Sequence, residues 1–367
     1  MADEARKQEV LDALKNLYDP DLNADVVSLG FVKDLTITGG EVKFTLELTT
    51  PACPLKDRFK ADAEELVGKL PWVSKVEAGI ASKVTSSAAL RPQEISLPGV
   101  KNIIAVASGK GGVGKSTVAA NLALALVREG SRVGLMDADV YGPSLPILLG
   151  VRELPAVSDQ QKLIPLERYG IKLMSLGFLV ASDQAVIWRG PMVHSLVQQF
   201  LRDVDWGELD YLIVDLPPGT GDAQLTLTQS IPLAGAVVVT TPQAMASSIA
   251  GKVVSLFQKM QVHVLGVIEN MSYFVCDGCG KEHDIFDRGG GERMAQRLKI
   301  PFLGRIPLDP RMRKADDAGM PVVQSAPESK VAQEFVSVAR NLAQQVSLAN
   351  AMYEAMGGAP ASASGAK

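Results

Sequence analysis

The spacing of apolar positions along the chain changes near residue 80. Before that point, residues 4–17 carry apolar side chains at helical spacing, and two alternating runs follow, VKDLTIT and EVKFTLELT. Because a Gly-Gly pair separates the two runs, they predict a β-hairpin. A helix over about 54–70 and a strand near 73–80 complete the pattern. Residues 1–80 are therefore expected to form a small α/β domain.

A second pattern starts at residue 99, after a segment (81–98) that is rich in Ser, Ala and Pro and is typical of a linker. Over 99–347, helical stretches alternate with short apolar runs, which are NIIAVAS, RVGLMD, IKLMSLG, YLIVDLP, AVVVTTP, HVLGVIE and FLGRIP. Continuous rather than alternating apolar strands predict an α/β fold with a mostly parallel sheet that helices cover on both faces. Residues 348–367 are expected to be a helix end and a disordered tail, because GGAPASASGAK is of low complexity.

Composition is that of an ordinary soluble protein. The chain has 367 residues, 47% hydrophobic and 21% charged, which is enough to bury a large core in two domains. No apolar run approaches the roughly 18 residues of a membrane-spanning helix, and the first residues, MADEARKQEV, are charged. We therefore expect a cytoplasmic protein with no membrane partner. The formal net charge is −4 with Lys and Arg scattered along the chain, so we expect no nucleic-acid partner.

The strongest chemical signal is the segment SGKGGVGKST, which follows the first strand of the larger domain and opens a helix. It contains the P-loop pattern G-x-x-x-x-G-K-S in the strand-loop-helix context that the motif requires. The nucleotide-binding residues predicted from it are Gly109, Lys110, Gly111, Gly112, Val113, Gly114, Lys115, Ser116 and Thr117. Backbone N–H groups would surround the phosphates of ATP, Lys115 would pair with them, and the Ser116 hydroxyl would ligate Mg²⁺. The alternative is a glycine-rich turn without a ligand.

Polar residues follow several of the predicted parallel strands. Asp137 and Asp139 end the second strand of the larger domain, Asp215 ends a later one, and Asn270 follows another. All four lie at the carboxyl edge of the sheet, where open α/β sheets bind ligands. Helix capping is the competing account for Asp137, and a turn is the competing account for Asn270.

Two of the three cysteines, Cys276 and Cys279, stand in a C-x-x-C spacing. Two thiols do not complete a metal site, because structural zinc and ordinary iron–sulfur clusters take four protein ligands. A zinc pair that includes His283 and a redox dithiol are alternatives.

The third cysteine, Cys53, lies at the start of a predicted helix with Lys56 and Arg58 close by. Both surroundings lower the pKa of a thiol. A role for Cys53 in cluster or partner handling and a role as a buried, inert cysteine are both compatible with its position.

The segments GKGGVGKST, DADVYGPS, VDLPPGTGD, TTPQAMA and VIENMS occur in this order. Together they resemble the Mrp/ApbC branch of the MinD/ParA-like P-loop ATPases, the iron–sulfur cluster carriers, over about residues 98–345. The segments VVSLGFVKDL and LTTPACPLKD are similar to the small iron–sulfur-assembly domain that is often fused ahead of this ATPase.

The resemblance implies roles for individual residues. The early lysine of the deviant Walker A motif, Lys110, would reach the nucleotide of a partner subunit, and a solvent-facing lysine is the alternative. Asp215 would be the Walker B carboxylate that holds Mg²⁺ through water, and Asp139 would position the attacking water. Asn270 would contact adenine. The catalytic residues implied are therefore Lys110, Lys115 and Asp139.

The same branch has C-x-x-C where Cys276 and Cys279 stand, although Asp277 and Gly278 replace its common Pro-His pair. A two-fold dimer brings identical surfaces together, so two such pairs would supply the four thiolates of a 4Fe–4S cluster. The resulting hypothesis is a homodimeric ATPase that binds a cluster at its interface, works with cluster-assembly factors and passes the cluster to apoproteins. A MinD/ParA-like positioning ATPase and a zinc-stapled nucleotide-binding scaffold are the alternatives.

Overall fold

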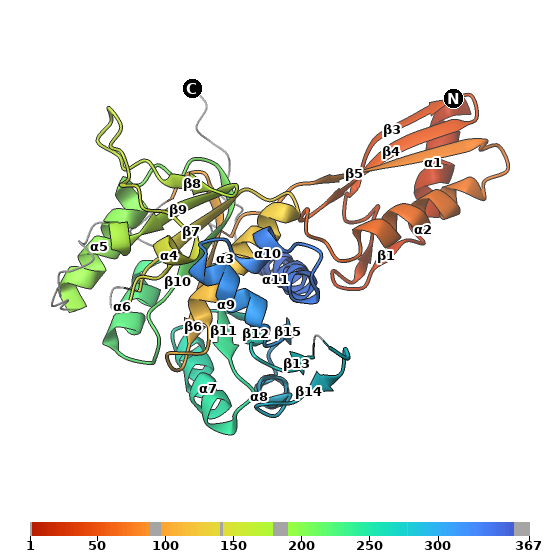
Figure 1. Cartoon of the computed structure of the whole chain (residues 1–367). Helices are drawn as coiled ribbons and strands as arrows, with labels where there is room; N and C mark the ends of the chain where they lie inside the picture. The colour runs from red at the N-terminus through yellow and green to blue at the C-terminus, as the bar shows by residue number, and fades with distance from the viewer. Residues whose placement is uncertain (1, 88–96, 140–141, 179–189, 277, 356–367) are drawn as a thin grey trace.

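The computed structural model describes residues 2–87, 97–139, 142–178, 190–276 and 278–355. It contains a small N-terminal unit and a larger α/β unit (Figure 1). Half of the expected linker, residues 88–96, and the last part of the expected tail, residues 356–367, lie outside the described residues.

The N-terminal unit places two helices against a three-stranded sheet of order β3-β4-β5. Its elements are α1 (Ala2–Leu14), β1 (Tyr18–Asp19), β2 (Ala24–Asp25), β3 (Val32–Thr38), β4 (Glu41–Leu48), α2 (Lys56–Gly68) and β5 (Lys75–Ser82). The expected hairpin is present as the antiparallel pair β3–β4. Strand β5 runs parallel to β4, because α2 crosses over between them. Alternate residues of β4 point into the core, as the period-two pattern requires.

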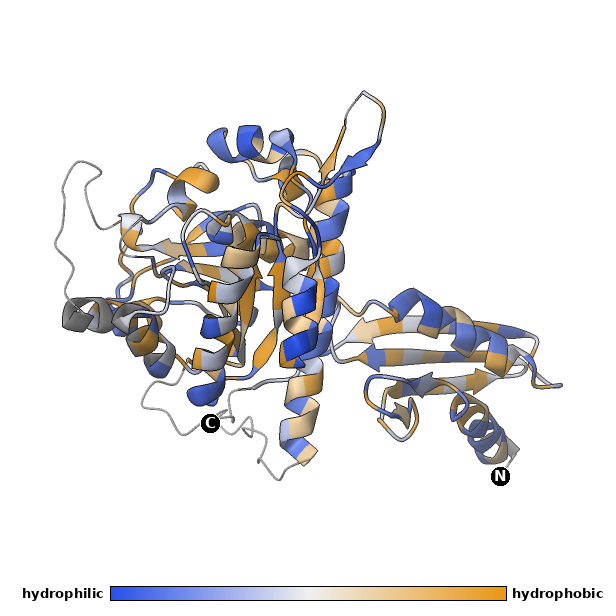
Figure 2. Cartoon of the chain, turned by 90° about the horizontal axis from the view of Figure 1, so that it is seen from below, coloured by the Kyte–Doolittle hydropathy of each residue, from blue (hydrophilic) through white to orange (hydrophobic). Residues whose placement is uncertain are grey.

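The larger unit is built on an eight-stranded sheet of order β15-β12-β11-β6-β10-β7-β9-β8. Its strands are β6 (Val100–Ser108), β7 (Val133–Asp137), β8 (Leu166–Arg168), β9 (Ile171–Ser175), β10 (Leu209–Asp215), β11 (Gly235–Thr240), β12 (Val264–Glu269) and β15 (Phe302–Arg305). All pairs are parallel except β8–β9. Figure 2 shows the strands coloured mostly as hydrophobic, and every residue of β7, β10, β11 and β12 is buried. The mostly parallel α/β fold expected from the sequence is confirmed.

Helices cover both faces of this sheet. They are α3 (Lys115–Arg128), α4 (Leu145–Leu148), η1 (Leu176–Phe178), α5 (Gly190–Asp203), α6 (Asp222–Ser230), α7 (Ala244–Lys259), α8 (Gly290–Leu298), α9 (Pro310–Asp317), α10 (Val322–Ser325) and α11 (Lys330–Ala355). The chain crosses the sheet in opposite directions from β6 to β7 and from β11 to β12. Because such crossovers are right-handed, α3 and α7 lie on opposite faces. Helix α11 packs beside α3, and α8 packs beside α7.

A buried carboxylate joins the two units. The Glu129 side chain, 7% exposed, accepts hydrogen bonds from Lys56 Nζ at 3.0 Å and from Arg340 of α11 at 2.9 Å. The hydroxyls of Thr50 and Tyr211 are 3.1 Å apart and buried in the same junction. The N-terminal unit is thus docked against α3 and α11 by polar contacts among groups that are distant in the sequence.

Cys53 lies close to this junction and is half-buried. Burial raises the pKa of its thiol, and this effect outweighs the nearby Lys56 ammonium, which is directed to Glu129 instead. The expectation of a lowered thiol pKa was therefore wrong, because the sequence does not show how far the site is desolvated.

Among the described residues, none of the helices has both the length and the apolar character needed to cross a membrane.

The Glu129 junction gives a prediction on stability. Burial raises the pKa of this carboxyl, but the hydrogen bonds from Arg340 and Lys56 outweigh burial and hold the pKa below its ordinary value. This contribution to stability is present above the ordinary carboxyl pKa and is lost as the pH falls through the lowered value. We expect Glu129→Gln to reduce the free energy of unfolding by about 1 to 3 kcal/mol at neutral pH and to speed proteolytic release of the N-terminal unit.

The control is Asp62→Asn, which removes the partner of an exposed ion pair with Arg58 and should change the free energy of unfolding by less than about 0.5 kcal/mol. Urea titrations and limited proteolysis of both variants provide the measurement. Equal behaviour of the two variants would show that Glu129 does not hold the units together.

Candidate functional site

The P-loop occupies residues 109–114, between β6 and α3, and its shape depends on two glycines in the left-handed region. Gly112 and Gly114 both have φ of 78°, a conformation that costs other residues about 1 to 2 kcal/mol. A Cβ at Gly114 would also lie 2.3 Å from Nδ2 of Asn270. Glycine at position 114 is therefore required by the backbone conformation and by the close approach of Asn270.

Asn270, 2% exposed, braces this loop from the end of β12. Its Nδ2 donates to the Val113 carbonyl at 2.9 Å, and its backbone N–H donates to the Thr240 carbonyl. The next residue, Met271, has φ of 55°, so the chain turns here. The structure brings Asn270 to the nucleotide loop, and contact of its amide with adenine stays a prediction.

Lys115, Ser116 and Asp215 converge where the P-loop meets the end of β10. Lys115 Nζ is 2.6 Å from Asp215 Oδ1, and the Ser116 hydroxyl donates to Asp215 Oδ2 at 2.5 Å. The hydroxyl and the carboxylate thus present oxygen atoms to the same point, and oxygen ligands are those that Mg²⁺ prefers. The donor set fits a magnesium ion that is completed by water and phosphate oxygens.

Asp139, 8% exposed, lies on the same side of Lys115, with 3.8 Å between Lys115 Nζ and Asp139 Oδ2. Its Oδ1 accepts from the backbone N–H of Gly142 at 3.3 Å. The carboxylate therefore faces the ammonium that would pair with phosphates, which is compatible with the predicted role in positioning water.

Asp137 has a different role. Its carboxylate is fully buried and accepts from the backbone N–H groups of Ser144 and Leu145 at the start of α4 and from the Ser175 hydroxyl. Burial and the nearby Asp215 charge raise the pKa of this carboxyl. The capping account given for Asp137 is therefore the one that the structure shows.

Lys110 extends along the surface of the P-loop towards α7. Its Nζ lies 3.5 Å from Oε1 of Gln243, the residue that precedes α7. The preceding Gly109 packs so closely on α7 that a Cβ there would lie 2.7 Å from the Ile249 side chain. The loop and α7 thus form one packed surface, and the reach of Lys110 to a partner's nucleotide stays a prediction.

Asp316 lies beside the loop and was not among the site residues predicted from the sequence. The Thr117 hydroxyl donates to Asp316 Oδ2 of α9 at 2.9 Å, and burial raises the pKa of Asp316 to about 6. The surrounding segment, DPRMRKADD (309–317), mixes acidic and basic residues, which is typical of a solvated turn and helix start. A signal was present, because Asp316 stands four residues after the apolar Met312 and so lies on the same buried face of the helix.

The C-x-x-C pair forms the tip of a small hairpin, which we call the cysteine hairpin (residues 274–283). It consists of β13 (Phe274–Val275) and β14 (Glu282–His283). Cys276 donates its backbone N–H to Lys281, and Gly280 donates to the Cys276 carbonyl. Cys276 is partly exposed and Cys279 is exposed, as expected for residues at a rim.

The described residues contain no group of three or more His, Cys, Asp and Glu side chains arranged to hold a metal ion. His283 lies in β14 with its ring 6.5 Å from that of Phe274. The zinc alternative that used His283 as a further ligand in the same chain therefore gains no support from the geometry.

A further buried carboxylate lies beside Asn270 and holds the segment that follows the cysteine hairpin. Glu269, fully buried and adjacent to Asn270, accepts from the backbone N–H groups of Gly289 and Gly291 at 2.9 and 2.6 Å and from the Ser272 hydroxyl at 2.5 Å. It thereby fixes the start of α8, which follows the hairpin. The motif VIENMS did not suggest this role, because a buried Glu beside a strand end has many uses.

A parallel sheet, a glycine loop with an early lysine, and Lys115 with Ser116 and Asp215 at its base define a P-loop NTPase. Two solved structures share this fold. A nucleotide-binding protein from Archaeoglobus fulgidus, in complex with ADP, is 43% identical with a TM-score of 0.55 and covers 61% of this chain and 88% of its own. The cell division ATPase MinD of Pyrococcus furiosus is 25% identical with a TM-score of 0.51, over 65% of this chain and 97% of its own.

The chain belongs to the NUBPL iron-transfer P-loop NTPase family, whose profile matches residues 99–343. Residues 7–78 match a second family, described as iron–sulfur cluster assembly protein. The iron–sulfur cluster carrier protein of Synechocystis is 49% identical over 93% of this chain and 98% of its own length. The family resemblance inferred from the sequence motifs is confirmed for both units.

The contact between Gly114 and Asn270 gives a prediction on stability. We expect Gly114→Ala to lower the free energy of unfolding by about 2 kcal/mol, because a methyl group there is both strained and in collision with a hydrogen-bonded buried amide. Gly111→Ala is the matched control in the same loop, since no atom lies within 4 Å of its Cβ position. Thermal unfolding of both variants without nucleotide measures the difference, and an unchanged midpoint for Gly114→Ala would contradict the tight approach.

Proposed function

We propose that the protein is an ATP-hydrolysing iron–sulfur cluster carrier that holds its cargo between two subunits and delivers it to apoproteins. The observation that carries this proposal is the pair Cys276 (partly exposed) and Cys279 (exposed), which lies in the same unit as the P-loop. Asn270 contacts the loop, and the adjacent Glu269 holds the segment that follows the hairpin. The relatives named as cluster carriers support it. As a cytoplasmic protein in a reducing compartment, the carrier would keep these cysteines in the thiol form that binds iron.

In this proposal each residue of the site has one role in ATP hydrolysis. Lys115 pairs with the phosphates, and the P-loop N–H groups bind their oxygens. Ser116 and Asp215 would hold Mg²⁺, which would neutralise phosphate charge when bound. The Asp139 carboxylate, close to Lys115, orients the attacking water.

The cluster site needs a second subunit, because each chain offers two cysteines at the hairpin. A two-fold axis near the hairpin would bring four thiolates together, which is the ligand number of a 4Fe–4S cargo. Next to the hairpin, Ile285 and Phe286 are 54% and 37% exposed. Apolar side chains left in water beside incomplete ligands are typical of a surface that another subunit covers.

Lys110 extends the dimer proposal to the nucleotide site. Its half-buried side chain reaches the edge of the packed surface formed by the P-loop and α7. In a face-to-face dimer its ammonium would add positive charge beside the partner's phosphates, where the transition state spreads negative charge. The bound nucleotide would then determine whether the dimer is closed. Assembly factors that load the cluster and apoproteins that receive it would bind to this dimer.

Hydrolysis is tested with Asp139→Ala and Lys115→Ala. We expect Asp139→Ala to bind ATP with nearly the wild-type dissociation constant and to hydrolyse it about a hundredfold more slowly. Lys115→Ala should lose binding, because the phosphates lose their charged partner. Equilibrium binding of a fluorescent ATP analogue and phosphate release provide the two readouts. A wild-type hydrolysis rate in Asp139→Ala would contradict its role.

Cargo binding is tested with Cys276→Ser and Cys279→Ser after anaerobic reconstitution with iron and sulfide. Each variant should lose the visible absorption of the cluster and the dimer that it stabilises, while wild type binds about four irons per dimer. Cys53→Ser is the matched control and should keep both, because Cys53 is half-buried with a raised pKa. Full iron loading in either hairpin variant would contradict the bridging site, and uptake of zinc without iron by wild type would favour the scaffold alternative.

A further inference from the structure

Helix α7 carries a stripe of polar residues on its exposed side. Ser248, Lys252, Ser255 and Lys259 recur at intervals of four, three and four residues, so they lie on one face. The sixteen residues of α7 include no acidic side chain. On a chain whose formal net charge is −4, this is a locally positive surface.

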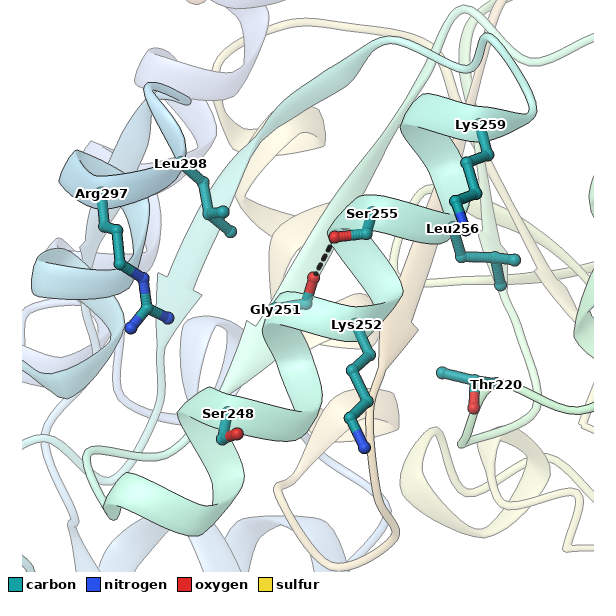
Figure 3. A pocket seen from close by; sticks show the side chains of 9 residues that line it. All are labelled: Thr220, Ser248, Gly251, Lys252, Ser255, Leu256, Lys259, Arg297 and Leu298. Atoms are coloured by element: carbon teal, nitrogen blue, oxygen red, sulfur yellow. Dashed lines mark hydrogen bonds between the residues drawn. The ribbon is translucent and has the colours of Figure 1, made fainter.

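The stripe borders a groove of about 470 Å³ between α7, the end of α8 and the turn after β10, which we call the α7 groove. Figure 3 shows α7 running through the middle of the groove, with Arg297 and Leu298 of α8 on one side and Thr220 on the other. Lys252, Lys259 and Arg297 are exposed. Within the part of the chain that the structure describes, these three cations form no ion pair.

Two other basic residues near α8 are neutralised. Arg293 pairs with Asp287, and Arg305 pairs with Glu292. Among the described residues, Lys252, Lys259 and Arg297 thus leave three unpaired positive charges side by side in the α7 groove.

The floor of the groove is apolar and open. Leu256 and Leu298 are partly exposed there. Gly251 lies in the interior of α7, where glycine costs a helix about 1 kcal/mol relative to alanine. A Cβ at this position would meet nothing closer than the Met294 sulfur at 3.7 Å. Packing against α8 therefore does not require glycine at position 251. The missing side chain keeps the groove open.

The groove also reaches the turn between β10 and α6, which contacts the residue before the P-loop and which we call the switch. Thr220 lines it and follows Gly219, whose N–H donates to the Ser108 carbonyl at the start of the P-loop and whose φ is 104°. On the other side, Gly109 of the loop packs directly on α7. A change in the turn after Asp215 would therefore change the wall of the α7 groove.

We propose that the α7 groove docks an acidic segment of a protein partner, with one apolar side chain of that segment placed on Leu256 and Leu298. Lys259 stands seven positions after Lys252, which is about 10 Å of helix. This spacing is too wide for one small anion and suits successive carboxylates of an extended or helical segment. Charge complementarity of this kind steers association and fixes register.

This inference rests on the proposed carrier function, in which the partner is an apoprotein that receives the cluster. The net negative charge of the chain disfavours a nucleic-acid phosphate backbone as the occupant. Because Thr220 belongs to the switch, docking is tied to the nucleotide that the P-loop holds.

The test uses cluster-free protein and a fluorescent peptide made of glutamate and leucine, with binding followed by anisotropy. The double variant Lys252→Glu/Lys259→Glu should weaken the peptide at least about tenfold. The matched control Lys162→Glu reverses an exposed lysine that lies elsewhere and should stay within about twofold of wild type. Gly251→Leu fills the groove without changing charge and should also weaken binding. Added salt should reduce the wild-type affinity.

Equal affinity in wild type and the double variant would overturn the proposal, as would tighter binding of single-stranded DNA or polyphosphate than of the peptide. Equal affinity with ADP and with a non-hydrolysable ATP analogue would overturn the link to the switch. The double variant should still load iron and sulfide, because neither lysine is at the cysteine hairpin. Failure of wild type to load a cluster would refute the carrier function and leave peptide docking as a separate result.

Discussion

The contact of Asn270 with the P-loop is the interaction on which the rest of the site depends. It requires a residue without a side chain at Gly114, and it holds the loop against the end of β12. The adjacent Glu269 uses the same strand end to fix the start of α8. Two neighbouring residues thus join the nucleotide loop to the segment that follows the cysteine hairpin. In an interior that is closely packed, such a junction moves as a unit rather than bending gradually.

The electrostatics of the site follow from how few positive charges are buried there. Lys115 is close to both Asp139 and Asp215, and Asp137 is buried behind them with a raised pKa. One ammonium does not neutralise this set of carboxylates. A divalent cation would add the missing positive charge and allow phosphate oxygens to approach, and the proposed Mg²⁺ fits this set of carboxylates for that reason.

The sequence was sufficient for features that depend on local pattern. Continuous apolar runs predict buried parallel strands because both faces of such strands are covered, and the P-loop is readable because its glycines and lysine are adjacent in the chain. Contacts between distant segments could not be predicted in this way. Glu129 with Arg340, Thr117 with Asp316, and the raised pKa of Cys53 all depend on which surfaces the fold brings together. The short edge strand β8 was also missed, because its sequence, LER, has no strand pattern.

Helix α11 fixes the distance between the cysteine hairpin and the N-terminal unit of the same chain. Its first turn contacts the cysteine hairpin through Lys330 and Glu282, and Gln344 contacts Asp21 of the N-terminal unit. These positions are fourteen residues apart, which is about 21 Å of straight helix. A rigid spacer of this length keeps the docked N-terminal unit from shielding the cysteines of its own chain. Cys276 is partly exposed and Cys279 is exposed in this arrangement, so a second polypeptide can approach the cysteine hairpin while the N-terminal unit stays docked.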